Sequence, residues 1–388
     1  MHVAEEAIRL AIACARSVEG RTSPRPPVGA VVVRDGSIIA QGATAPPYGP
    51  HAEVVALTAA GTAADGADLY VTLEPCCIFV HTPPCTDAII AAGIRRVIIG
   101  ALDPNPRVQL QGIERLRSTG IEVMVLEDEQ FAPACAQIVR PFEQYIFHGR
   151  PYVTAKWAMT LDGKLATRSG DSRWISGPEA RLWVHDLRDR VDAILVGANT
   201  ARIDNPQLTV RIPPDKRIWQ RTEREHAPLR VVLSTRGTLP DTLSLLQPEL
   251  AARTCVLVNA TSSIEQHQQL ADRGVEVIPV AANEKGQVDF PAALQALAHK
   301  GMMHVLVEGG ASVLGSAFDQ HCIDHVAAFI APKLLGGHNA PSPVAGEGLA
   351  TMRQAQCLHN IQTHIFGEDI LIEGDVPHPS RGPSLPSD

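Results

Sequence analysis

The chain has 388 residues, and its 42 acidic and 34 Lys and Arg side chains give a formal net charge of −8. Hydrophobic residues make up 45% and charged residues 20%, which is ordinary globular usage and excludes a mainly disordered chain. The acidic balance argues against general binding of nucleic acids or anionic membranes, because either needs a dominant basic face. The length predicts two or three domains, each large enough for its own core.

The predicted elements begin with an N-terminal helix and a hairpin. Apolar residues at helical spacing predict a helix over 5–18, and the Asp35-Gly36 turn joins predicted strands over 29–33 and 37–40. The elements expected next are a helix beginning near His51, strands over 68–72, 96–101 and 121–126, and helices over 86–92 and 113–118. This alternation predicts a compact α/β layer domain.

The alternation of strands and helices restarts in the second half. Strands are predicted within 151–163, 191–201, 229–235, 254–260, 274–280, 303–310 and 326–335. We place the domain boundary near 147–151, where His-Gly-Arg-Pro interrupts two periodic stretches. The predicted domains are 1–147 and 148–375, followed by a Pro- and Ser-rich tail at 376–388 that is expected to be disordered.

The N-terminus is not expected to be a signal peptide. Glu5 and Glu6 stand where such a peptide needs a cationic flank, and no stretch approaches the ~18 uninterrupted apolar residues of a membrane span. Cys76, Cys77 and Cys85 lie within ten positions of the sequence. In a chain without a secretion signal, such a cysteine cluster indicates a metal or catalytic site rather than disulfides. We therefore expect a cytoplasmic protein.

The strongest local signal is a set of metal-ligating residues. His51 begins a His-Ala-Glu run, while Cys76 and Cys85 each follow a proline. One imidazole and two thiolates leave a tetrahedral Zn²⁺ with an open position, and water bound there has a pKa near 7. Glu53 lies close enough in sequence to share the pocket without binding the metal, so it can take the water proton and return it to a leaving amine. This arrangement is that of zinc deaminases.

A structural zinc site is the main alternative. Cys77 or His81 would supply a fourth ligand and close the open position. Cys76 is preferred as the ligand over Cys77 only because it follows Pro75.

These motifs resemble the deaminase half of the bifunctional deaminase–reductase family of riboflavin biosynthesis. The resembling segments of the first half are Pro26-Pro27-Val28-Gly29, His51-Ala52-Glu53, Thr82-Pro83-Pro84-Cys85 and Asp103-Pro104-Asn105-Pro106. The resemblance continues over almost all of the second half through the segments 156–164, 170–176, 204–211, 307–310 and 330–337. It implies a cytidine-deaminase-like three-layer α/β/α domain, followed by a dihydrofolate-reductase-like α/β domain that uses NADPH.

The resemblance also implies a reductase site. The residues that would hold a phosphorylated substrate are Lys156, Ser172, Ser176, Arg188 and Arg211, with Asp204 and Glu308 as the catalytic pair nearest the reacting carbon. The chain has no G-x-G-x-x-G segment, and Gly310, Gly315 and Ser316 lack the lysine of a P-loop. Strand–glycine–helix junctions can present N–H groups to a phosphate, or can be tight turns that need glycine. The residues expected to bind the cofactor are Trp174, Gly197, Thr200, Gly309 and Gly310.

The first half departs from this family in the substrate pocket. Arg25 stands where the family usually has asparagine, and the segments 77–81 and 109–112 replace residues that are usually polar or basic. Lost hydrogen bonds cost ~1–3 kcal/mol each in a buried site, although Arg25 and His81 can supply phosphate contacts from new directions. Three alternatives stay open: a protein active only as a reductase, a deaminase–reductase for another aminopyrimidine or purine-like compound, and a zinc-stabilised dimerisation or ligand-binding module.

The resemblance implies two consecutive reactions on small phosphorylated aminopyrimidines. The first is hydrolytic deamination of 2,5-diamino-6-(5-phosphoribosylamino)pyrimidin-4(3H)-one, and the second is NADPH-dependent reduction of the ribosyl side chain to ribityl. The expected cofactors are Zn²⁺ and NADPH. We expect a homo-oligomer, as is common in the family, with neither nucleic acid nor membrane as a partner.

Overall fold

The computed structural model describes residues 2–79, 82–218 and 220–377. The chain forms two units: unit 1 comprises Met1–Pro151, Pro213–His226 and Gly301–Met303, and unit 2 comprises Tyr152–Ile212, Ala227–Lys300 and His304–Asp388. Most of the predicted tail, 378–388, lies outside the described residues. Val376, which was predicted to begin the tail, is instead buried, and its N–H donates to the carbonyl of Asp324.

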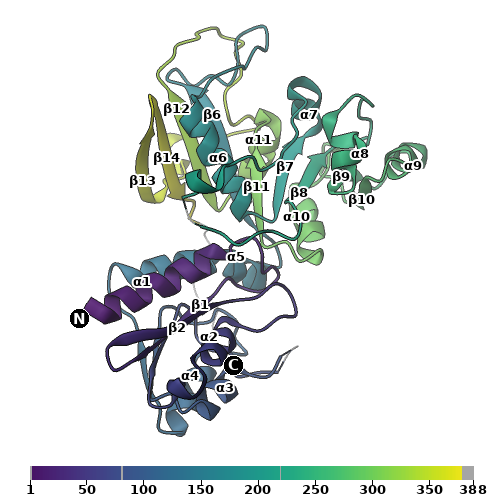
Figure 1. Cartoon of the computed structure of the whole chain (residues 1–388). Coiled ribbons are helices and arrows are strands. Elements are labelled where there is room, and N and C mark those ends of the chain that lie inside the picture. The colour runs from purple at the N-terminus through teal and green to yellow at the C-terminus, as the bar shows by residue number, and fades with distance from the viewer. Residues whose placement is uncertain (1, 80–81, 219, 378–388) are drawn as a thin grey trace. The chain divides into compact units, whose positions relative to one another are not determined.

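Unit 1 is built on a five-stranded sheet with the strand order β2-β1-β3-β4-β5. Strand β1 is antiparallel to both β2 and β3, whereas β3, β4 and β5 are parallel. Its helices and strands, several of them labelled in Figure 1, are α1 (His2–Ser17), β1 (Gly29–Arg34), β2 (Ser37–Ala43), α2 (Ala52–Ala60), β3 (Asp68–Val71), α3 (Cys85–Ala91), β4 (Arg96–Ile99), α4 (Gln111–Ser118), β5 (Glu122–Val125) and α5 (Phe131–His148).

Both faces of this sheet are buried, and the alternation of side chains along β1 shows how. Ala30 and Val32 belong to one apolar cluster with residues of α2, α3 and α4. Val31 and Val33 belong to a second cluster with residues of α1 and α5. Because successive side chains of a strand point to opposite faces, the sheet lies between two helical layers. The predicted three-layer α/β/α arrangement is therefore present.

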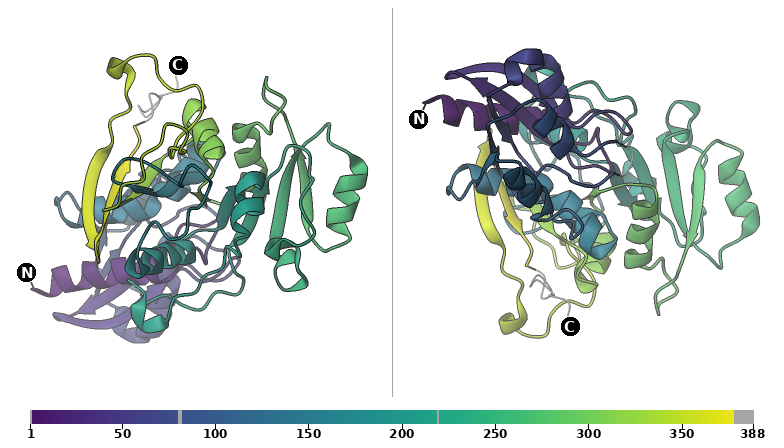
Figure 2. Two further views of the ribbon diagram at one scale, coloured as in Figure 1. Left: turned by 90° about the horizontal axis from the view of Figure 1, so that it is seen from above. Right: turned by 90° about the horizontal axis from the view of Figure 1, so that it is seen from below.

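Unit 2 is built on a nine-stranded sheet with the strand order β10-β9-β8-β7-β11-β6-β12-β14-β13. The seven strands from β10 to β12 are parallel, and the last two pair antiparallel as a hairpin at one edge (Figures 1 and 2). Its helices and strands are β6 (Tyr152–Thr160), α6 (Pro178–Arg190), β7 (Ala193–Gly197), α7 (Ala198–Asp204), β8 (Leu229–Leu233), α8 (Pro248–Ala251), β9 (Thr254–Asn259), α9 (Ile264–Ala271), β10 (Glu276–Val280), α10 (Phe290–His299), β11 (His304–Glu308), α11 (Ala311–Asp319), β12 (His325–Ala331), β13 (His359–Phe366) and β14 (Asp369–Asp375).

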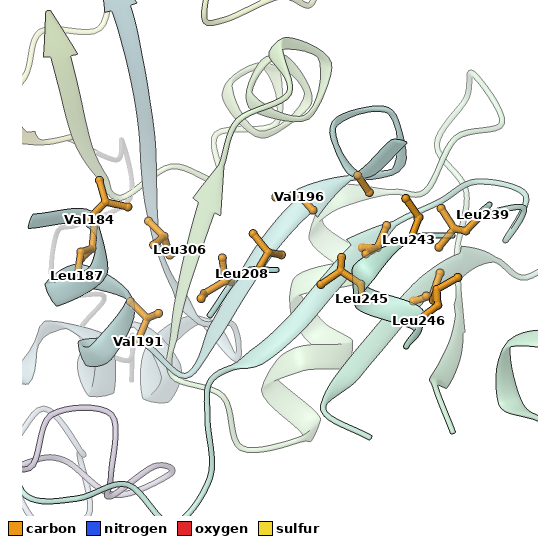
Figure 3. Packing of buried hydrophobic residues seen from close by; sticks show 14 of the residues in the cluster. Val184, Leu187, Val191, Val196, Leu208, Leu239, Leu243, Leu245, Leu246 and Leu306 are labelled. Atoms are coloured by element: carbon orange, nitrogen blue, oxygen red, sulfur yellow. The ribbon is translucent and has the colours of Figure 1, made fainter. Parts of the chain in front are cut away.

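An apolar cluster covers one face of this sheet. Figure 3 shows Val184 and Leu187 of α6 and the leucines of the segment 239–246 together with Val196 of β7 and Leu306 of β11. The continuous apolar stretches of β7 and β11 are typical of strands buried on both faces of a parallel sheet. This packing fixes the carboxyl ends of β7, β8 and β11, and Gly197 and Glu308 are the last residues of β7 and β11.

Two segments have a structure that the sequence did not predict. Helix α5 contains Pro141 in its interior, which removes one helical hydrogen bond and weakens the sequence signal. Helix α5 also extends to His148, so the expected domain boundary after residue 147 falls in its last turn. The hairpin of β13 and β14 was missed because β13 is almost wholly exposed and therefore lacks an apolar alternation.

Candidate active sites

The three predicted metal ligands meet at one point in unit 1. His51 is the N-cap residue of α2, Cys76 lies in the loop after β3, and Cys85 is the first residue of α3. The Nδ1 atom of His51 lies 3.2 Å from the Sγ atom of Cys85 and 3.6 Å from that of Cys76. One ligand atom from each of the three residues lies within 4.8 Å of those of the other two. We call His51, Cys76 and Cys85 the metal triad.

The metal triad fits zinc. Zn–S and Zn–N bonds of ~2.3 Å and ~2.0 Å at tetrahedral angles give a nitrogen-to-sulfur distance of ~3.5 Å, close to both observed distances. The Cys85 thiol and the His51 ring lower the pKa of the Cys76 thiol to about 4, so this ligand is a thiolate. Two sulfurs and one imidazole nitrogen leave one position of a tetrahedral metal for water or substrate.

The metal triad contains Cys76 and not Cys77, which the sequence had left as an alternative ligand. Cys77 is not among the residues whose ligand atoms meet there, within the described part of the chain. Burial raises the pKa of the Cys77 thiol, which disfavours the thiolate form. The other alternative ligand, His81, lies outside the described residues.

Glu53 lies in the first turn of α2, two residues after His51, and is buried. Burial and the neighbouring Cys76 thiolate raise the pKa of the Glu53 carboxyl to about 7. A carboxyl group with such a pKa can both accept and release a proton near neutral pH. The structure thus places an acid–base group beside the metal triad.

A cavity of about 290 Å³ opens beside the metal triad. The residues that line it, apart from those of the triad and Glu53, are mostly apolar and include Val28, Leu73, Ile78, Val108, Phe142 and Ile146. Sequence reasoning did not assign Glu74 and Asp103 to the site, although both line the cavity. The signal for Asp103 was present, because it belongs to the Asp-Pro-Asn-Pro segment. Arg25, which the sequence offered as a group able to contact phosphate, lines the cavity and donates to the carbonyl oxygens of Ala45, Pro46 and Gly49.

A second group of predicted site residues meets in unit 2. Arg188 of α6 donates from Nε and Nη2 to the two carboxylate oxygens of Glu308, at 2.5 and 2.8 Å. Lys156 of β6 is the parallel-strand partner of Glu308 of β11. Burial lowers the pKa of Lys156, and burial alone would raise that of Glu308, but Arg188 holds the Glu308 pKa below its usual value. Two cations therefore flank one carboxylate at the carboxyl end of β11.

Arg188 also positions the segment that carries Arg211. Its Nη1 atom donates to the carbonyl oxygen of Thr209 at 3.0 Å, and the N–H of Arg211 donates to Nδ1 of His185 at 3.2 Å. Burial and the nearby Arg188 lower the pKa of His185 to about 4, so its ring is neutral. Sequence reasoning missed His185, which lies one helical turn before Arg188 and so faces the same side of α6.

The remaining predicted residues lie in neighbouring loops of unit 2. Asp204, the last residue of α7, has its pKa raised by burial, while Arg173 and a hydrogen bond from Ser172 act in the opposite direction. Trp174 is exposed, and the Arg181 guanidinium lies 4.5 Å from its ring centre. The carbonyl oxygen of Ser176 accepts from Arg181 at 2.6 Å.

A second cavity, of about 460 Å³, opens at the carboxyl ends of β7 and β8. Gly197 lines it, whereas Trp174, Thr200, Gly309 and Gly310 are not among its lining residues. Thr200 and Gly310 do meet nearby, because a Cβ atom on Gly310 would lie 2.8 Å from Oγ1 of Thr200. Glycine is therefore required for this close approach.

This cavity has a donor set that suits a phosphorylated dinucleotide. Its polar lining residues are Asn199, Arg202, Ser234, Thr235, Arg236, Thr238, Gln287, Ser312 and Ser316. Two guanidinium groups and several hydroxyls match the charge and hydrogen-bonding needs of phosphates. Ser312 lies in the first turn of α11, an end of a helix that favours anions. Sequence reasoning missed most of these residues, which lie in helices and loops that follow different strands.

No helix in the described part of the chain is long and apolar enough to span a membrane.

Comparisons with known proteins match each half of the chain to a known domain. Residues 1–101 match the cytidine and deoxycytidylate deaminase zinc-binding region, and residues 151–370 match the RibD C-terminal domain. The riboflavin biosynthesis protein RibD of Bacillus amyloliquefaciens is 41% identical over 362 residues, which is 93% of each chain. The predicted α/β fold class is confirmed in both units.

Solved structures give the same result over the whole chain. A structure of Acinetobacter baumannii RibD matches with a TM-score of 0.82 and 32% identity, covering 97% of this chain and 99% of that one. A diaminohydroxyphosphoribosylaminopyrimidine deaminase/5-amino-6-(5-phosphoribosylamino)uracil reductase from Thermotoga maritima matches with a TM-score of 0.79 and 34% identity, covering 97% and 99%. The resemblance seen in the motifs is confirmed, and the chain belongs to the RibD family of riboflavin biosynthesis proteins.

Proposed function

We propose that the chain is a bifunctional enzyme of riboflavin biosynthesis. Unit 1 hydrolytically deaminates 2,5-diamino-6-(5-phosphoribosylamino)pyrimidin-4(3H)-one, and unit 2 reduces the ribosyl side chain of the product to ribityl with NADPH. The observation that carries this proposal is the presence of both sites in one chain, the metal triad with Glu53 and the Lys156–Arg188–Glu308 cluster with its neighbouring cavity. The relative from Thermotoga maritima is described by both activities.

In unit 1 the reaction needs a metal and a proton carrier. His51, Cys76 and Cys85 would hold a zinc ion, which would act as a Lewis acid and lower the pKa of bound water. Glu53 accepts a proton from the attacking water and delivers it to the departing amino group, for which its raised pKa suits it. The apolar walls of the cavity exclude bulk water and hold the pyrimidine ring. Ammonia and the deaminated pyrimidine leave.

In unit 2 the side chains bind an anionic substrate and place its ribosyl carbon. The polar lining of the second cavity would hold NADPH, which would supply the hydride. Arg188 and Lys156 bind the phosphate or the sugar oxygens, with Ser172, Ser176 and Arg211 as further donors. Glu308 and Asp204 are the acidic groups that we assign to the reacting end. Arg236 is assigned to the 2′-phosphate that distinguishes NADPH from NADH, because it lines the cavity in the loop after β8.

The alternative of a protein active only as a reductase has less support. A unit that had lost deamination would not need a complete metal triad, a thiolate at Cys76 or a buried Glu53, and all three are present. The changed pocket residues around Arg25 and Ile78 leave the metal triad itself intact.

A paired assay tests the proposal. The zinc-loaded protein should release ammonia from the diamino substrate, and then oxidise NADPH without added intermediate. A chelator should abolish ammonia release while NADPH oxidation with the already deaminated substrate continues. Oxidation of NADPH with the deaminated substrate, but no ammonia from the diamino one, would show that the chain is a reductase alone.

We also infer that the chain forms a homo-oligomer and acts in the cytoplasm. The support for the oligomer is the edge strand β13, whose Ile361 and Ile365 side chains are exposed. An exposed edge with apolar residues is a surface that proteins normally cover. Light scattering of the purified chain measures the mass, and a monomer at micromolar concentration would contradict the inference.

A further inference from the structure

A loop beside the metal triad accepts three hydrogen bonds from one arginine. Residues Ala45–Gly49 follow strand β2 and precede His51. Arg25 donates from Nη1 to the carbonyl oxygen of Gly49 at 2.7 Å, and from Nη2 to those of Ala45 and Pro46 at 2.7 and 2.5 Å. The loop thus folds around the guanidinium group, and we call it the clamped loop.

The hydrogen bonds of Arg25 limit what else it can do. A guanidinium group has five N–H donors, and the clamped loop takes three of them, including both on Nη2. A bidentate phosphate contact needs two parallel donors on the same edge of the group. With both Nη2 hydrogens committed, no edge of Arg25 offers such a pair. Its geometry is that of a residue that orients backbone.

The clamped loop contains Tyr48, whose backbone conformation is unusual. Its φ angle is 71°, in the left-handed region that non-glycine residues seldom adopt. Its side chain is 79% exposed, yet Tyr48 is among the residues that line the cavity of the metal triad. A costly backbone conformation persists only where the surroundings impose it, and such conformations cluster at ligand-binding sites. Here Arg25 binds carbonyl oxygens on both sides of Tyr48, and the backbone hydrogen bonds from Ala45 to Pro50 and from Gly49 to Pro46 close the same loop.

The cavity is otherwise suited to a flat ring. Ile78, Val108 and Phe142 provide apolar walls, while Asn105 and Asp103 provide polar groups for the ring edge. Enzymes that act on bases commonly stack the ring between aromatic or apolar side chains and bind its edge through hydrogen bonds. Tyr48, which is exposed and lines the same cavity, adds an aromatic surface on which such a ring can stack.

We propose that Tyr48 stacks on the aminopyrimidine ring of the substrate, and that Arg25 is a positioning residue that acts through Tyr48. This proposal rests on the deaminase function proposed for unit 1. It makes Tyr48 and Arg25 a linked pair that sets substrate affinity, while the metal triad and Glu53 perform the chemistry.

Ammonia release by the zinc-loaded full-length chain tests the proposal. Tyr48→Ala should raise KM for the diamino substrate by about 10-fold, as expected for loss of one stacking contact, with kcat much less affected. Tyr48→Phe, which keeps the ring, should restore most of the lost affinity. Arg25→Gln should raise KM by a similar factor, and the double variant by no more than either single change. Non-additivity of this kind shows that the two residues act as one unit.

The controls separate this linkage from other roles of Arg25. Arg34→Gln is the control, because Arg34 is another arginine of unit 1 that donates to a backbone carbonyl oxygen, that of Ala63, but lies outside the residues lining the cavity. It should leave KM unchanged. Additive effects of the Arg25 and Tyr48 changes would overturn the proposal. So would an Arg25 effect that disappears with the dephosphorylated substrate, because Arg25 would then contact the phosphate directly.

If the deaminase function proposed for unit 1 is wrong, the wild-type chain releases no ammonia from the diamino substrate, whatever the role of Tyr48. Calorimetric titration of the same compound into the zinc-loaded wild type and the same variants then decides the proposal, by the same pattern of non-additive losses in affinity. Equal affinity of all variants would overturn it.

Discussion

Replacing Glu308 by glutamine should destabilise unit 2 by a measurable amount. In the structure, Glu308 receives two hydrogen bonds from Arg188, and the two side chains are only 11% and 12% exposed. Lys156 lies beside them on the neighbouring strand, so the substitution leaves two largely buried cations without this carboxylate. Removing one partner of a buried pair costs about 3–5 kcal/mol of the free energy of unfolding. Glutamine keeps one acceptor oxygen, so we expect ~3 kcal/mol.

Thermal unfolding followed by tryptophan fluorescence measures this loss. Trp157, Trp174 and Trp183, three of the four tryptophans, belong to unit 2 and report on its transition. At roughly 2–4 °C per kcal/mol for a domain of this size, Tm should fall by about 6–12 °C. NADPH should raise the same transition, which identifies it as that of unit 2.

A double-mutant cycle checks the physical cause. Arg188→Met alone leaves Glu308 without its principal partner, whereas the Arg188→Met and Glu308→Gln double variant removes both charges. The double variant should therefore lose less stability than the sum of the single variants. A Tm change below about 2 °C for Glu308→Gln, or strict additivity in the cycle, would refute the claim that the pair stabilises unit 2.

Three further outcomes are expected. Glu53→Gln should retain zinc by metal analysis but lose ammonia release by at least about 100-fold, and full release would exclude its acid–base role. Arg236→Gln should raise KM for NADPH by roughly 10- to 100-fold and leave that for NADH unchanged, whereas equal effects would show that Arg236 does not read the 2′-phosphate. Burial alone would lower the pKa of His325, but its hydrogen bonds to Asp375 and Glu373 raise it above 6.5. Protonated His325 therefore stabilises unit 2 below pH 6.5, and this contribution is lost as the pH rises through the raised pKa. His325→Gln should abolish that part of the pH dependence in denaturant titrations, and an unchanged profile would contradict the assignment.

The metal triad could be predicted because its chemistry is local in sequence. His51, Cys76 and Cys85 each carry a ligand atom, and their neighbouring prolines and helix starts fix where these atoms lie. The sequence favoured Cys76 over Cys77 only through the preceding Pro75, because adjacent residues of a loop differ mainly in the direction of their side chains. The loop conformation decides that direction.

Helix α5 and strands β13 and β14 show where apolar periodicity in the sequence fails to predict secondary structure. A proline inside α5 and the exposed faces of β13 remove the apolar periodicity on which prediction depends, and tertiary packing forms these elements nevertheless. The lining of the second cavity was missed for another reason. Ser234 and Arg236 follow β8, while Ser312 follows β11, and only the parallel order of the sheet brings these strand ends together.

The sequence by itself determined the fold class, the family and the chemical identity of the metal ligands, because these depend on local motifs and their order. Only the tertiary structure decided which charged groups neutralise one another. Arg188 was expected to bind the substrate and Glu308 to act near the reacting carbon. In the structure the two side chains also form an ion pair with each other. Arg25 was considered as a residue able to contact phosphate, and it binds the clamped loop. An arginine side chain can reach several hydrogen-bond acceptors, and the packing of the sheet and loops determines which of them it binds.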